Sequence, residues 1–233
     1  MPATSGYILA QSGDGILVTS FKISGFTCPA CGSVFDARTV TSITHQGQDS
    51  DFLPHYLGEN PLPYFLVQCP DCNFSGYPED YVGLEVVPSK ITTGSIKRIL
   101  SMPICRKIPE EARKFFVAGK IYEETGRNPY HIGNLYLRGS WCCRLHENRK
   151  AEIEMQQMAV KFLRLAVEKS TINNPDNLPV VTYLIGELYR RLEDRKSARE
   201  WFGAVEEVLI DQEQQWILEL TQKQAELNEH FIN

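Results

Sequence analysis

Two short cysteine motifs, Cys28-Pro29-Ala30-Cys31 and Cys69-Pro70-Asp71-Cys72, decide how the first third of this chain folds. In each motif two residues separate the cysteines, a spacing that lets both sulfurs reach one metal ion. Together the motifs offer four thiolates, which is a common ligand set for a tetrahedral structural zinc site. We therefore predict one structural zinc ion with four ligands, namely Cys28, Cys31, Cys69 and Cys72.

The residues that follow the motifs support this prediction. Gly32 and Asn73 occupy matching places after the second cysteine of each motif, and both residue types tolerate the positive φ of a tight turn. His45 and His55 could replace a cysteine as a ligand, but four cysteines are already present, so we interpret both as ordinary loop residues. Because four thiolates fill a tetrahedral coordination sphere, the pattern indicates a structural zinc ion and not a catalytic one.

The cysteines could have roles other than zinc binding. The chain has seven cysteines, and an odd number without a secretory signal argues against a disulfide framework. No basic residue precedes Lys22, so we expect no signal peptide and a cytoplasmic protein that does not enter a membrane. A thiol redox switch or a redox-regulated chaperone that uses the C-P-x-C pairs remains the alternative function.

The 233 residues divide into two parts of different charge. Residues 1–85 contain two basic and nine acidic residues, whereas residues 86–233 contain 22 basic and 20 acidic residues. An acidic first part repels phosphate backbones, so nucleic acid is an improbable partner. Seven basic residues fall between Lys90 and Lys114, and we interpret 86–108 as a basic linker that lies along the acidic part. Binding of RNA or of an acidic partner is the alternative for this segment.

The first part has the pattern of a small β-rich module. Segments 16–23, 39–44 and 63–68 are rich in β-branched or aromatic residues and predict strands, and residues 46–63 between them predict a loop. We assign 1–85 to this module, which resembles a zinc ribbon. Such a small core would gain stability from a bound metal ion.

From residue 109 the apolar residues recur with a helical period. The pattern predicts helices over 109–125, 129–146, 148–170, 178–192, 195–210 and 212–231. The stretch Ile185-Gly186-Glu187-Leu188-Tyr189, followed by Ala198 and Phe202, is typical of a tetratricopeptide (TPR) unit, in which small residues let two helices approach closely. The expected fold class is therefore α+β: the zinc module, then a TPR-like helical solenoid over 109–233 that ends in a capping helix.

A TPR-like solenoid presents a groove lined by the first helix of each pair, and such grooves bind protein partners. The residues expected to line it are Phe116, Lys120, Tyr136, Ser140, Tyr183, Glu187 and Arg190. We interpret Cys105, Cys142 and Cys143 as packed thiols. The sequence shows no phosphate-binding loop, nucleophile elbow or zinc-protease motif, so we expect a scaffold or adaptor and no enzyme.

The chain also resembles a bacterial family that is known only as a domain of unknown function. The resemblance covers about residues 25–210 and rests on five stretches: 28–35, 49–52, 56–64, 69–72 and 183–192. It implies an N-terminal C-P-x-C…C-P-x-C module joined to TPR-like helices, and it implies no reaction. The chain departs from the family pattern at Asn73, where Gly is commoner, and at the paired Cys142-Cys143.

Overall fold

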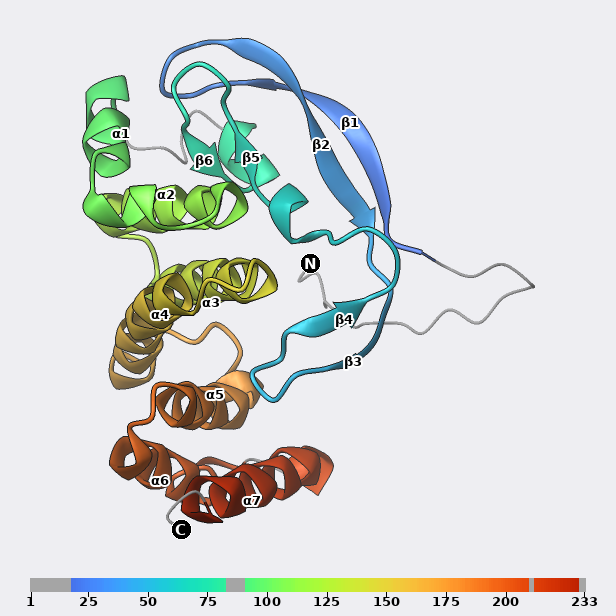
Figure 1. Ribbon diagram of the computed structural model, residues 1–233, viewed down its shortest axis with the longest axis vertical. Coiled ribbons are helices and arrows are strands. Elements are labelled where there is room, and N and C mark those ends of the chain that lie inside the picture. The colour runs from blue at the N-terminus through green and yellow to red at the C-terminus, as the bar shows by residue number, and fades with distance from the viewer. Residues whose placement is uncertain (1–17, 83–90, 210–211, 231–233) are drawn as a thin grey trace.

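Helices and strands occupy separate sides of the molecule. The computed structural model describes residues 18–82, 91–209 and 212–230. Helices α2 to α7 are stacked along the long axis, and the strands lie beside them (Figure 1). The mixed arrangement of several helices and small antiparallel sheets confirms the α+β class.

Among the described residues, the strands pair into three two-stranded antiparallel sheets, β1 with β2, β3 with β4, and β5 with β6. Their bounds are β1 Ser20–Thr27, β2 Val34–Ser42, β3 His45–Gln48, β4 Pro54–Tyr56, β5 Val67–Gln68 and β6 Ser75–Gly76. The strand expected over 63–68 is only two residues long, because Leu62–Tyr64 forms a 3₁₀ turn with a proline in its first positions. The strand expected over 16–23 begins at Ser20, and residues 16 and 17 lie outside the described residues.

The helices lie close to where the periodicity predicts them. Their bounds are α1 Thr93–Leu100, α2 Glu110–Thr125, α3 Pro129–Leu145, α4 Arg149–Glu168, α5 Leu178–Arg191, α6 Arg195–Gly203 and α7 Gln215–His230. Helix α6 is shorter than expected and is followed by a 3₁₀ turn, Glu206–Val208.

The segment interpreted as a linker is partly helical, which corrects the prediction. Helix α1 begins after Thr92, whose side chain accepts a hydrogen bond from the backbone N–H of Ser95. Ile96 and Ile99, three residues apart on one face, are buried in the main core. Two basic residues of this segment pair with acidic residues of helices, Arg98 with Glu124 and Lys107 with Glu154. No such pair with the acidic strands is found among the described residues, and residues 86–90 lie outside them.

Close helix packing depends on glycines at the contacts. A Cβ atom added to Gly186 in α5 would lie 2.6 Å from Cδ1 of Phe202 in α6. One added to Gly119 in α2 would lie 2.6 Å from Cζ of Tyr136 in α3. Because each glycine has no side chain, the aromatic ring of the neighbouring helix can lie directly against its backbone.

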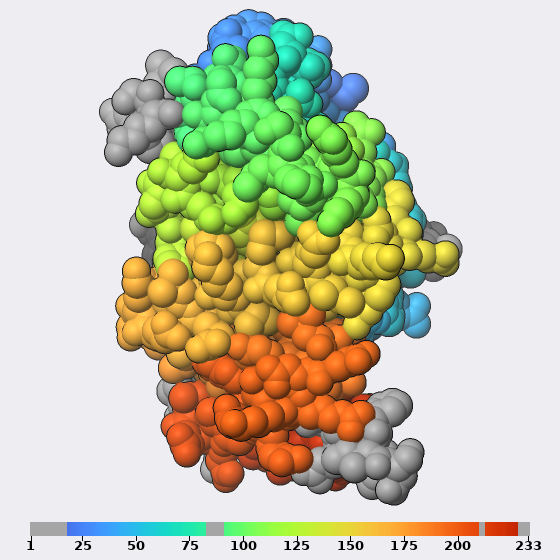
Figure 2. Space-filling model, turned by 60° about the vertical axis from the view of Figure 1, so that its left-hand side comes forward, coloured from blue at the N-terminus to red at the C-terminus, as the bar shows by residue number. Residues whose placement is uncertain are grey.

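The outer face of the stack is formed by helices throughout. In Figure 2 they follow one another as bands from green to red along the long axis, with the first strands visible at the top. None of the described helices is both long enough and apolar enough to cross a membrane.

We expect Gly186→Ala to destabilise the protein by about 1–3 kcal/mol, because the added methyl group overlaps the ring of Phe202. The matched control is Gly203→Ala near the end of α6, where no atom lies within 4 Å of the added Cβ. Denaturant unfolding measures both variants. Equal stability of Gly186→Ala and the wild type would contradict the close contact.

Candidate metal centre and the loop it anchors

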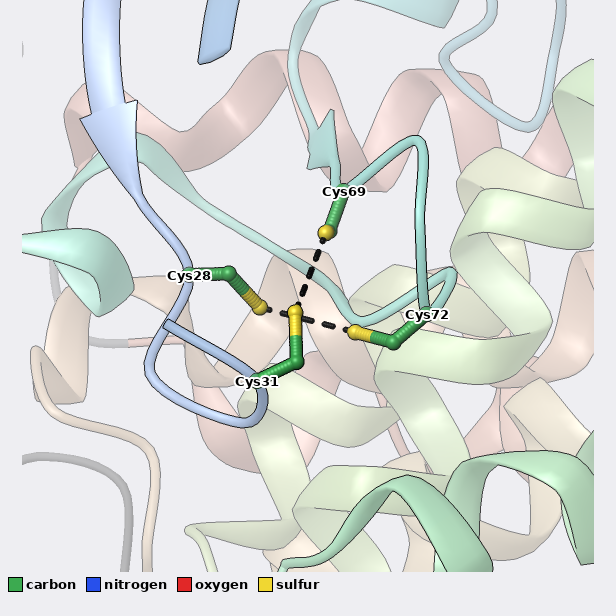
Figure 3. A group of neighbouring side chains, drawn as sticks. All are labelled: Cys28, Cys31, Cys69 and Cys72. Atoms are coloured by element: carbon green, nitrogen blue, oxygen red, sulfur yellow. Dashed lines mark hydrogen bonds between the residues drawn. The ribbon is translucent and has the colours of Figure 1, made fainter. Parts of the chain in front are cut away.

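The four predicted cysteines converge on one point (Figure 3). Cys28 and Cys31 belong to the turn between β1 and β2, and Cys69 and Cys72 to the turn between β5 and β6. The Sγ atoms of Cys28 and Cys72 are 3.5 Å apart, those of Cys31 and Cys69 are 3.6 Å apart, and all four lie within 4.8 Å of one another. A tetrahedral zinc ion with Zn–S bonds of about 2.3 Å separates its sulfurs by about 3.8 Å. The cluster therefore fits zinc.

The two cysteine turns have the same backbone structure. In the first, Gly32 N–H donates to the Cys28 carbonyl at 2.8 Å, and in the second, Asn73 N–H donates to the Cys69 carbonyl at 2.9 Å. Both turns need a residue with positive φ, and the structure has φ of 76° at Gly32 and 62° at Asn73. The matching positions in the sequence are thus matching positions in space.

The surroundings of the sulfurs determine how readily each thiol loses its proton. Burial raises the pKa of Cys28 to about 11 and also raises the pKa of Cys72. Cys31 is exposed, and a hydrogen bond from the backbone of Ser33 lowers its pKa. A bound divalent cation would favour the thiolate form of all four, so metal binding releases protons and weakens as the pH falls.

Aromatic side chains pack beside the two cysteine turns. The Tyr81 hydroxyl donates to one of the carbonyls of Val67 and Phe74, each 2.9 Å away, and so lies against both strands that flank the second cysteine pair. Its ring packs edge-on against Phe26, Phe35 and Phe74. These rings join the two cysteine turns independently of any metal.

The chain between the two cysteine pairs reaches the helices through the loop that joins β3 and β4. Asp51 at its tip is fully buried and accepts hydrogen bonds from the Trp141 indole at 3.0 Å and from Arg144 at 2.9 and 2.5 Å. Arg191 of α5 lies 3.3 Å from the same carboxylate. A buried carboxylate is stable only when paired in this way.

The residues beside Asp51 extend this contact to α5. Ser50 donates its hydroxyl to Glu187 at 2.6 Å and accepts at its carbonyl from the Tyr183 hydroxyl at 2.7 Å. Phe52 packs against the rings of Tyr183 and Trp216, and its φ is 66°. A bulky residue keeps such a conformation only where its surroundings hold it. We call residues 49–53 the docked loop.

The docked loop covers part of the predicted groove. Tyr183 and Glu187 are buried and contact the loop, as just described. Phe116, Tyr136 and Ser140 are also buried, in contacts within the protein. Only Lys120 and Arg190 remain partly accessible, and each pairs with a glutamate of its own helix, Glu123 or Glu187. A role for these residues in binding a partner stays a prediction. A partner could contact Tyr183 and Glu187 only if the docked loop moved away from them.

The other residues considered from the sequence lie apart from the metal centre. His55 pairs with Asp49, and His45 is exposed on β3. Cys105, Cys142 and Cys143 are buried in the main core, as their interpretation as packed thiols requires.

Sequence reasoning missed the docked loop and its arginine partners. The stretch 49–52 carried the family resemblance, but it was assigned to a loop without a role. Its signal was two acidic residues, Asp49 and Asp51, beside the aromatic Phe52, and nothing local distinguishes this pattern from an exposed turn. Arg144 and Arg191 come from helices 93 and 140 residues further on.

Comparisons with known proteins give a family and no function. Residues 24–228 match the model of a family described as "Uncharacterized protein conserved in bacteria (DUF2225)". Searches of the curated proteins and of the solved structures find no match.

We expect Asp51→Ala to destabilise the protein by about 1–3 kcal/mol, because the buried Trp141 indole loses its acceptor and the two arginines lose the carboxylate they share, while Arg144 keeps Glu152 and Arg191 keeps Glu187. The control is Asp36→Ala on the exposed side of β2, which should change stability by less than about 0.5 kcal/mol. Thermal and urea unfolding give both values. Equal stability of the two variants would show that the loop is not anchored through Asp51.

Proposed function

The chain belongs to the uncharacterised bacterial family DUF2225, and from its own metal centre and helices we propose that it is a non-enzymatic zinc-binding scaffold for a protein partner. Four thiolates complete the coordination of zinc and leave no position for a substrate. The ion would be structural, with one per chain.

The convergence of the four sulfurs is the observation that carries this proposal. The chain leaves the cysteine cluster at Cys31 and returns to it at Cys69, after 37 intervening residues. A zinc ion there would fix both ends of this excursion, which presents the docked loop to α3 and α5. The metal would therefore support the position of a loop on the helices and not a reaction.

The helices supply the interaction part of the proposal. Their stacking and the contact of Gly186 with Phe202 agree with a TPR-like solenoid, and arrays of this kind bind proteins through a long surface. Lys120 and Arg190 are the predicted groove residues that still reach solvent. Arginine is also common among residues that dominate binding energy.

A thiol redox switch is the second candidate, and the exposure of Cys31 favours it. Hydrogen peroxide can reach this sulfur and oxidise the Cys28–Cys31 pair to a disulfide, with reduction of the peroxide to two waters and release of zinc. Peroxide treatment, followed by mass spectrometry and a zinc-binding dye, tests this. Retention of zinc under peroxide would exclude the switch.

We expect about one zinc ion per chain in protein purified without added metal. Cys69→Ser removes a fully buried ligand and should abolish zinc binding and destabilise the strands. The matched control is Cys105→Ser, a buried cysteine outside the cluster, which should keep its zinc. Elemental mass spectrometry measures the metal content. Metal-free wild type with both C-P-x-C pairs oxidised would contradict a structural zinc site.

The scaffold role predicts that Lys120→Ala/Arg190→Ala loses a protein captured by the wild type from a bacterial lysate. The variant should fold, because Glu187 keeps its ion pair with Arg191 and its hydrogen bond from Ser50 when Arg190 is replaced. The charge-matched control, Lys150→Ala/Lys196→Ala, changes two exposed residues of α4 and α6 and should capture the same protein. Identical capture by all three proteins would contradict the assignment of the groove.

A further inference from the structure

A cavity of about 380 Å³ lies between the β3–β4 hairpin and helix α3. Ligand sites of small molecules have volumes of about 300–1,000 Å³ and often lie where two parts of a protein meet. This cavity is at such a place, because Phe52 and Tyr56 of the hairpin form one wall and Trp141 of α3 forms another. It is separate from the cysteine cluster, none of whose residues line it.

Four aromatic side chains are among the residues that line the cavity. Phe52, Tyr56, Phe65 and Trp141 line it. Two of these rings are held in place by contacts on their other side: the Trp141 indole donates to Asp51, and Phe52 packs against Tyr183. Preformed aromatic walls bind the flat face of another ring, and a ligand that binds to them loses little affinity to ordering of the protein.

Arg138 contributes a positive charge to the cavity, whose lining also includes His45. Arg138 of α3 lines the cavity, with its guanidinium carbon 5.2 Å from the centre of the Phe65 ring. One of its terminal nitrogens donates to the Tyr77 hydroxyl at 2.7 Å. Among the residues that the structure describes, no carboxylate forms an ion pair with Arg138. This differs from Arg144, Arg190 and Arg191, each of which pairs with a buried acid.

From these observations we propose that the cavity binds a small molecule that has a flat apolar body and one acidic group. The body stacks between the rings of the hairpin and Trp141, and the acidic group pairs with Arg138. A guanidinium offers several N–H donors in one plane, so it suits a carboxylate or a phosphate, and a hydrogen bond to Tyr77 uses only one of them. Binding at this place goes beyond the scaffold role, which makes no use of the cavity.

The probe for this site is 8-anilino-1-naphthalenesulfonate, a fluorescent molecule with a flat apolar body and one anionic group. We expect the zinc-loaded full-length protein to bind about one molecule per chain, and Arg138→Gln to weaken binding by at least about tenfold. N-Phenyl-1-naphthylamine, which lacks the anionic group, should bind both proteins with affinities within about twofold. The control Arg106→Gln changes an exposed arginine that does not line the cavity, and it should bind the anionic probe like the wild type.

Two competitors distinguish the acidic groups. Displacement of the anionic probe by 2-naphthoate assigns a carboxylate ligand, and displacement by adenosine monophosphate assigns a phosphate ligand. Ile43→Phe adds a ring to the lining and should weaken both fluorescent probes without changing the thermal midpoint. Equal weakening of the charged and uncharged probes by Arg138→Gln, or displacement by neither competitor, would overturn the proposal.

Discussion

The meeting of four cysteine sulfurs between two turns is the constraint on which the first part of the molecule depends. Each of the sheets that the structure describes has two strands, and a two-stranded sheet is only marginally stable in water. Aromatic packing around Tyr81 supplies part of the missing stability. A tetrahedral ion that joins the β1–β2 turn to the β5–β6 turn would supply the rest, since it cross-links residues far apart in the sequence.

The same constraint explains how the strands and the helices come to form one body. With its two ends held together, the segment between Cys31 and Cys69 projects away from the cysteines and places Asp51 among Trp141, Arg144 and Arg191. A second polar contact lies nearer the cysteines, where buried Asp80 accepts from Tyr122 and Arg127 of the α2 region. Buried charges of this kind specify one arrangement, because any other leaves them unpaired. The groove predicted from the helices alone is therefore partly filled by the chain itself.

Local patterns in the sequence predicted the parts of this structure that local physics determines. The spacing of the cysteines, with Gly32 and Asn73 in place for positive φ, predicted the two turns, and the small Gly186 predicted a close helix contact. The contact of Asp51 with Arg191 could not be predicted, because it joins residues 140 positions apart and no local pattern assigns a particular arginine of a helix to an acidic residue of a distant loop. The helix over 93–100 was not predicted because it is short and begins with Thr, Gly and Ser, so that only Ile96, Ile99 and Leu100 indicate a helical period. The aromatic cavity likewise combines residues from four separate segments.

We propose that four thiolates hold one zinc ion in a closed coordination sphere. X-ray absorption spectroscopy at the zinc edge, on protein purified without added metal, identifies the ligand atoms. We expect a single shell of four sulfur atoms at about 2.3 Å and no oxygen or nitrogen ligand. A shell that contains a water oxygen or a histidine nitrogen at about 2.0–2.1 Å would contradict it, because the site would then have an open position or a different ligand set.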